Sequence, residues 1–229
     1  MSDSAYRRDS AAFFEPTDRT RLQRYPGRAR YERDAIYDVL DEALVCHMGF
    51  SVRSQPYVIP TLCARVDDQL YLHGSAASRA LTAMTSLPRV CVTATILDGL
   101  VLSRSAFNHS VNYRSVVVIG SATLIADIGE KRRALEQFTN AIVVGRWDDV
   151  RPPTRQELKG TTILRIPLVE ASLKSRSGGP TDPDEERELD AWAGVIPLSV
   201  RASEPIPDPT LREGIAVPRY VAAYVRNRS

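Results

Sequence analysis

The chain has 229 residues, a formal net charge of +2, 43% hydrophobic residues and 25% charged residues. These values are typical of a globular protein with one well-buried domain, and the near-neutral charge gives no general attraction to nucleic acid or to a membrane surface. The sequence shows neither a signal-peptide pattern nor an apolar run of membrane-spanning length, so we expect a cytoplasmic protein.

The first part of the chain predicts a surface arm followed by a helix and a hairpin. Residues 1–30 are polar and rich in Arg and Asp, which is typical of an extended arm. Apolar residues at helical spacing predict a helix over 34–43. Strand patterns over 44–51 and 57–66 then predict an antiparallel hairpin.

The most informative stretch lies where a strand over 69–75 gives way to a helix over 77–85. A glycine, two serines and an arginine meet there: Gly74, Ser75, Ser78 and Arg79. Because the first N–H groups of a helix lack backbone partners, this grouping favours an anion site, most often for a phosphate. The simpler alternative is that Ser78 caps the helix and Arg79 is solvated.

The middle of the chain is rich in strand patterns. Strands are predicted over 90–96 and 100–105, with Asp98–Gly99 as the turn between them. A polar stretch over 107–115 then leads into the longest strand pattern, over 116–126. The Gly120-Ser121-Ala122 sequence within that pattern indicates a bulge or a close approach of the backbone to a neighbour.

The remaining elements are a helix over 130–144, a capping-box helix over 154–158, a strand over 161–172 interrupted by Pro167, a mobile loop over 175–186, a strand over 191–198 and a short helix around 220–224.

The chain therefore has six or seven strands, mostly in meander order. Helices do not alternate strictly with strands, which argues against a doubly wound parallel sheet. We expect a mainly β fold, a small antiparallel barrel with peripheral helices. The expected domain runs over 31–200, between the arm and a Pro-rich tail over 201–229.

Cysteine and histidine spacing does not indicate a metal site. Cys46, Cys63 and Cys91 lie far apart within apolar strand-like runs, and none forms a CxxC pair. We expect reduced, buried cysteines. No arrangement of nucleophile and base typical of hydrolases stands out either.

Several motifs in this order resemble those of the pyridoxamine 5'-phosphate oxidase-like flavoproteins, which have an FMN-binding split barrel. The resemblance is strongest to the flavin-nucleotide-binding or nitroimidazole-resistance branch and covers roughly residues 34 to 200. The motifs are Val39–Phe50, Tyr57-Val58-Ile59-Pro60-Thr61, Leu70-Tyr71-Leu72-His73-Gly74-Ser75, Ser78-Arg79, Asn112-Tyr113-Arg114-Ser115, Gly120-Ser121-Ala122, Glu130-Lys131-Arg132 and Trp192-Ala193-Gly194-Val195-Ile196-Pro197.

The resemblance implies a cytoplasmic homodimer with FMN in the groove between subunits, and a small-molecule substrate. It places Ile59, Pro60 and Thr61 beside the isoalloxazine edge, and His73, Gly74, Ser75, Ser78 and Arg79 at the ribityl chain and phosphate. Asn112, Tyr113, Arg114 and Ser115 would approach the flavin from a neighbouring strand, and Trp192 from the partner subunit. We expect a flavin-dependent oxidoreductase that transfers a hydride to or from a small, flat substrate.

Two alternatives remain open. The protein could instead be a carrier or sensor that binds a flavin, a deazaflavin or a haem without turnover, with His73 or His109 as the axial haem ligand; His47 fits a place in the structure or at the rim. The second alternative is that the protein is a degenerate member of the fold that acts only through dimer contacts. Oxidation of vitamin B6 is not implied, because those enzymes bind the substrate phosphate with a His near the C-terminus, and no His follows His109 here.

Overall fold

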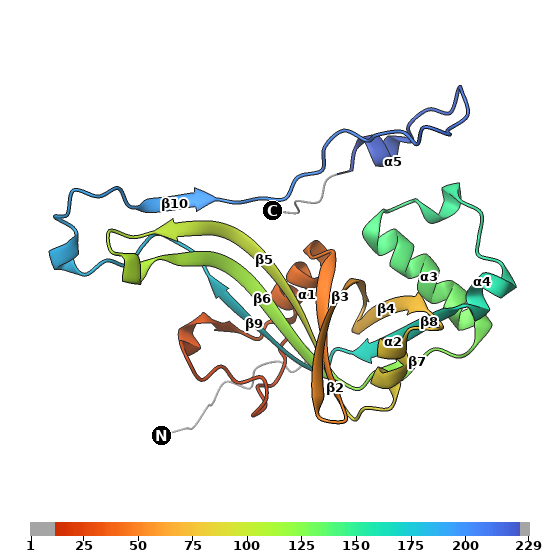
Figure 1. Ribbon diagram of the computed structural model, residues 1–229, viewed down its shortest axis with the longest axis horizontal. Coiled ribbons are helices and arrows are strands. Elements are labelled where there is room, and N and C mark those ends of the chain that lie inside the picture. Colours follow the sequence, from red (N-terminus) through yellow and green to blue (C-terminus); the bar gives the residue numbers. More distant parts are fainter. Residues whose placement is uncertain (1–11, 225–229) are drawn as a thin grey trace, which may run out of the picture.

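The structure is a computed structural model in which residues 12–224 are described, and their ten strands form one antiparallel sheet that curls into a split barrel (Figure 1). The strands are β1 (Ala29–Arg30), β2 (Val45–Val52), β3 (Gln55–Val66), β4 (Gln69–Ser75), β5 (Val90–Leu102), β6 (Ser110–Gly120), β7 (Thr123–Leu124), β8 (Thr161–Pro167), β9 (Glu170–Arg176) and β10 (Gly194–Pro197). The helices are α1 (Arg33–Glu42), α2 (Arg79–Thr85), α3 (Ile128–Ile142), α4 (Arg155–Lys159) and α5 (Arg219–Ala222), with 3-10 turns η1 (Pro26–Arg28), η2 (Ala106–Asn108), η3 (Trp147–Asp149) and η4 (Asp184–Glu186). The expected fold class is confirmed.

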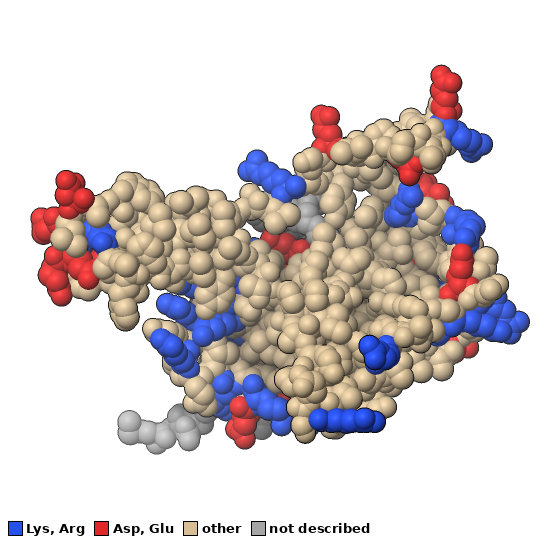
Figure 2. Space-filling model, viewed as in Figure 1, with Lys and Arg blue, Asp and Glu red and all other residues tan. Residues whose placement is uncertain are grey.

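The strand order is β1-β9-β6-β5-β2-β3-β4-β8-β7, and β10 also pairs with β5. The inner half of β5 pairs with β2, whereas its outer half, from Gly99 to Leu102, pairs with β10. The β5–β6 hairpin therefore extends beyond the barrel, and Figure 1 shows this arm projecting with β10 beside it. Figure 2 shows acidic side chains gathered at the free end of the arm, where η4 lies.

The predicted Asp98–Gly99 turn was wrong. β5 runs without interruption from Val90 to Leu102, and the register with β6 shifts between Leu97 and Gly99, so the dipeptide forms a β-bulge. Asp-Gly chemistry suits a bulge as well as a turn. A larger residue at Gly99 would also be crowded, because a Cβ there would lie 3.0 Å from the Ile196 carbonyl oxygen of β10.

Three further boundaries differ from the predictions. β6 begins at Ser110 and ends at Gly120, so two-thirds of the predicted polar stretch is strand and the 116–126 pattern is divided. The 161–172 pattern is likewise two strands, since the chain leaves β4 after Pro167 and joins β6 as β9. The loop predicted as mobile contains the end of β9 and a buried carboxylate, Asp182.

Two apolar clusters hold the fold together. The larger one fills the barrel and receives Ile36, Val39 and Leu40 from α1. The smaller one lies between the sheet and α3 and includes Ala64, Tyr71, Ala134, Phe138 and Ile163. α3 is thus fixed against β3, β4 and β8, which matters because one candidate site residue lies beneath it.

The capping box predicted for α4 is present: the Glu157 N–H donates to Thr154 Oγ1 at 3.2 Å, and the Thr154 N–H donates to Glu157 Oε2 at 2.7 Å. The short C-terminal helix is also present as α5. It returns to α3 after an exposed, extended segment, and Arg146 Nη1 donates to the Tyr220 hydroxyl at 3.2 Å. Within residues 12–224, no helix is long and apolar enough to cross a membrane.

Candidate functional site

Strand register defines one face of the sheet on which polar and small side chains gather. Residues paired across an antiparallel ladder point to the same face. His47 pairs with both Pro60 and Thr93, and Thr95, on the face of Thr93, pairs with Ser115. We call this surface, which carries His47, Pro60, Thr93, Thr95 and Ser115, the open face. Its hydroxyl groups are linked, because Thr95 Oγ1 and Ser115 Oγ lie 2.8 Å apart.

Successive side chains of a strand point to opposite faces, so the residues expected at the flavin are divided between the two faces of the sheet. Pro60 lies on the open face, but Ile59 and Thr61 point into the barrel, opposite the buried Met48 and Cys46. Tyr113 and Ser115 share the open face, whereas Asn112 and Arg114 point the other way. Only every second residue of each predicted motif can therefore line one surface.

Arg114 is held by two carboxylates on the far side of the sheet. Its Nη1 lies 2.6 Å from Glu42 Oε2 and its Nη2 lies 2.7 Å from Asp98 Oδ1. These hydrogen bonds, Asp98 first and Glu42 second, raise the pKa of Arg114. The residue links α1 to the bulge of β5. Asn112 is buried and donates to the Gly178 carbonyl at 3.1 Å.

His73 lies on the same face as Pro60 but is covered by α3. The strand register shows this: His73 and Tyr71 lie two residues apart on β4 and share a face, and Tyr71 pairs with Ala64 of β3. Along β3, Ala64 shares its face with Leu62 and Pro60. The rings of His73 and Phe138 meet edge to face with centroids 4.4 Å apart. His73 Nδ1 is buried and has no hydrogen-bond partner within residues 12–224. Burial lowers the pKa of His73, so the imidazole is neutral at neutral pH.

A buried ring nitrogen without a partner is costly, so it points to a ligand. A neutral imidazole is also the form that binds iron. A cavity of about 410 Å³ lies between β3 and α3; it is lined by Ala64 of β3, by Ala141 and Ile142 of α3, and by Tyr220 from the C-terminal tail, but not by His73 or Phe138. That volume is within the range of ligand pockets.

The residues expected at a phosphate are bonded within their own turn. Ser75 Oγ accepts from the Ala77 N–H at 3.2 Å, and Ser78 Oγ accepts from the Leu81 N–H at 3.3 Å. Gly74 is packed against Leu81, because a Cβ there would lie 2.9 Å from Leu81 Cδ1. Arg79 is exposed at the start of the seven-residue α2. A phosphate role for this turn stays a prediction.

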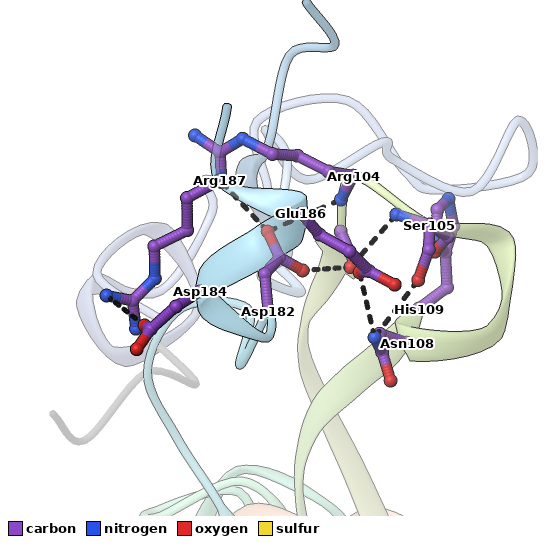
Figure 3. A network of polar contacts seen from close by, with 9 residues as sticks. Arg104, Ser105, Asn108, His109, Asp182, Asp184, Glu186 and Arg187 are labelled. Atoms are coloured by element: carbon purple, nitrogen blue, oxygen red, sulfur yellow. Dashed lines mark hydrogen bonds and ion pairs between the residues drawn. The ribbon is translucent and has the colours of Figure 1, made fainter. Parts of the chain in front are cut away.

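Trp192 and the other histidines lie elsewhere. Trp192 is 68% exposed on the arm, just before β10. His109 is exposed at the tip of the β5–β6 hairpin, where its Nδ1 lies 2.8 Å from the Ser105 carbonyl (Figure 3). His47 is exposed on the open face. Among residues 12–224, no three His, Cys, Asp or Glu side chains are grouped so that they could hold a metal ion.

Thr95 and Phe138 were not among the expected site residues. Thr95 could have been found, because Thr93 and Thr95 alternate with Val92 and Ala94, and such alternation places hydroxyls on one face. Phe138 lies in the helix predicted over 130–144, but nothing in the local sequence indicates that its ring covers His73.

Comparison with known proteins gives matches over most of the chain. A family model described as pyridoxamine 5'-phosphate oxidase matches residues 32–175. The structure of the flavocytochrome Anf3 from Azotobacter vinelandii is 36% identical, with a TM-score of 0.86, covering 90% of this chain and 96% of that chain. The FAD- and haem-binding protein from Mycobacterium smegmatis is 33% identical, with a TM-score of 0.82, covering 85% and 95%.

A candidate 5-nitroimidazole antibiotic resistance protein from Bacteroides thetaiotaomicron is 21% identical, with a TM-score of 0.54, covering 64% of this chain and 85% of that chain. This likeness shows the fold alone. A comparison with curated protein sequences gave no match.

Proposed function

The chain belongs to the pyridoxamine 5'-phosphate oxidase family, and from that premise we propose that it is a redox protein that binds a flavin nucleotide and a haem. The observation that carries the haem part is His73, a half-buried neutral imidazole that packs against Phe138 and whose buried Nδ1 has no hydrogen-bond partner within residues 12–224. Two structures with at least 33% identity are named for a flavocytochrome and for an FAD- and haem-binding protein, which supports the same assignment.

The residues present fit both groups. His73 would hold the haem iron through its buried ring nitrogen. Pro60, Thr95 and Ser115 would line the flavin on the open face, where the hydroxyls of the last two can bond ring or ribityl oxygens. When bound, the flavin supplies hydride transfer and the haem supplies single-electron transfer. The protein itself would bind and orient these groups and exclude water.

We also propose that two copies form the working unit. On the open face β3 exposes Val58, two residues before Pro60, and the arm exposes Trp192, so uncovered apolar side chains lie on the elements that would hold the flavin. Exposed apolar side chains of this size favour an interface. Trp192 of one copy would then reach the flavin of the other. We also propose that the protein acts on a small-molecule substrate and is located in the cytoplasm.

The spectrum of the purified protein tests the cofactors. We expect flavin bands and a Soret band, either as isolated or after FAD or FMN and haem are added. His73→Ala should lose the Soret band and keep the flavin bands, because it removes the ligand and leaves the open face intact. His109→Ala is the matched control and should keep both. A protein that binds neither group would overturn the proposal, and loss of the Soret band only in His109→Ala would reject His73 as the ligand.

A further inference from the structure

Three cations gather around the ring of Tyr25 at the edge of the sheet, and we call Arg24, Arg28 and Lys174 the cation cluster. The guanidinium carbons of Arg24 and Arg28 lie 5.1 and 4.4 Å from the ring centroid. Lys174 pairs with Ala29, the residue next to Arg28. Within residues 12–224 none of the three forms an ion pair. Figure 2 shows Lys and Arg side chains gathered below the arm, where the N-terminal segment lies.

The loop that carries the cluster is firmly held. Tyr25 has φ of +58°, an uncommon conformation for a residue other than glycine, and its carbonyl accepts from the Arg28 N–H at 2.9 Å. Arg19 Nε donates to Glu170 Oε2 of β9 at 2.8 Å. The Tyr31 hydroxyl accepts from the Leu22 N–H at 3.2 Å. An ordered loop therefore carries the two arginines. The left-handed backbone of Tyr25 within it is a strained conformation of the kind found at ligand sites.

The cluster is continuous with the open face. Lys174 pairs with Ser115, which pairs with Thr95, so the three side chains form one row on the same face. At one end of the row lie the linked hydroxyls, and at the other end lies Lys174, beside Ala29 and the turn that carries Arg24 and Arg28. A ligand whose ring lies over Thr95 and Ser115 can extend along this row to the cations.

We propose that the cation cluster binds the diphosphate of a dinucleotide whose redox-active ring lies on the open face. Two arginine forks and one ammonium group suit a diphosphate, which carries two negative charges and many acceptor oxygens. The dinucleotide is either FAD, in which case the inference rests on the proposed function, or a separately bound nicotinamide dinucleotide. The positive potential is also felt by Tyr25, whose pKa is lowered, first by its hydrogen bond with Arg24.

Ligand titrations of the full-length protein test this inference. The variant Arg28→Glu/Lys174→Glu would be titrated with FAD, riboflavin and ADP-ribose. A lost charge-assisted phosphate contact is worth about tenfold or more in affinity. If FAD is the ligand, its affinity should fall by at least about tenfold while riboflavin is unaffected. If a separate dinucleotide is the ligand, ADP-ribose binding should fall and FAD binding should not.

The control Arg132→Glu makes the same type of charge change on the exposed side of α3 and should alter none of these affinities. Arg24→Gln, a milder change at an exposed residue, serves if the double variant folds poorly by circular dichroism. Unchanged affinities for both FAD and ADP-ribose would overturn the inference. A wild-type protein that binds ADP-ribose through the cluster but no flavin would uphold it and reject the flavin part of the proposed function.

Discussion

The direction of individual side chains decides which of the motif residues can form a site. Pro60 and Ser115 lie on one face, but their chain neighbours Thr61 and Arg114 lie on the other. A contiguous motif in a strand therefore combines residues for two surfaces. Only those on the open face can meet the same flavin, and Arg114, which binds Glu42 and Asp98, has a structural role.

Gly120 shows a constraint at the residue scale that the sequence did suggest. A Cβ at this position would lie 2.8 Å from Ile166 Cγ2, so the close backbone approach predicted there is confirmed. Gly120→Ala should overpack the barrel and lower the free energy of unfolding by about 1–3 kcal/mol. Gly179→Ala is the control, because nothing lies within 4 Å of its Cβ position. Urea unfolding of both variants checks this, and equal stabilities would contradict it.

At the scale of elements, Asp182 joins the loop after β9 to the tip of the β5–β6 hairpin. Its carboxylate accepts from the Ser103 hydroxyl and lies 2.8 Å from Arg104 Nη1 (Figure 3). Glu186 of the same loop accepts from Asn108 Nδ2 at 3.2 Å. These contacts hold the loop against the hairpin tip. They therefore set the position from which the chain continues to Trp192 and β10.

Removing the Asp182 charge should release this loop. The hydrogen bond from Ser103, together with Arg104, lowers the pKa of Asp182 below its ordinary value of about 3.9. The contact therefore stabilises the loop fully above that pH and is lost as pH falls through the lowered pKa. In a Trp147→Phe background, Trp192 fluorescence should stay constant from pH 7 to about pH 4 and change below it.

The variant Asp182→Asn should show faster amide hydrogen exchange over 182–193 at neutral pH and no such acid transition. Asp184→Asn is the matched control, because the ion pair that Asp184 forms is with Arg187 of its own loop, at 2.9 Å (Figure 3). If exchange in Asp182→Asn equals that of the parent protein, the loop is held by other contacts.

At the scale of the whole molecule, much apolar surface is uncovered in the single chain. Val58 is 68% exposed on β3, and Ile206 is 93% exposed in the extended tail that Figure 1 shows crossing above the barrel. A surface of this kind is typical of a protein whose second copy completes it. The cavity beside α3, partly closed by Tyr220, and the open face would both then lie within reach of a partner subunit.

A charge in the middle of the exposed β3 surface tests the dimer. Val58→Glu should shift the protein from dimer to monomer in light scattering and weaken flavin binding, because a buried, unpaired carboxylate is costly at an interface. Val169→Glu is the control, since Val169 is similarly exposed, at 63%, but lies in the turn between β8 and β9. A monomeric parent protein, or a Val58→Glu variant that remains dimeric, would reject this arrangement.

The sequence by itself determined the type and order of most elements, because apolar periodicity and capping residues act locally. The helix over 34–43 and the capping box at Thr154 are found where they were predicted. The same local rules could not tell the Asp98–Gly99 bulge from a turn, because the outer half of β5 pairs with β10, which lies nearly 100 residues later in the chain. They also could not separate β8 from β9, since each pairs with a different distant strand.

The candidate site was decided by tertiary structure for the same reason. The sequence singled out His73 as a cofactor or haem residue, but its buried, unpartnered Nδ1 depends on α3, which begins more than 50 residues later. The cation cluster depends on the pairing of β1 with β9, which joins Ala29 to Lys174, 145 positions later in the chain. The type of each side chain is given by the sequence, whereas its burial and the charges near it are set by contacts between distant segments. The chemistry of the site could therefore be proposed from the sequence, but the place of the site in the molecule could be found only from the fold.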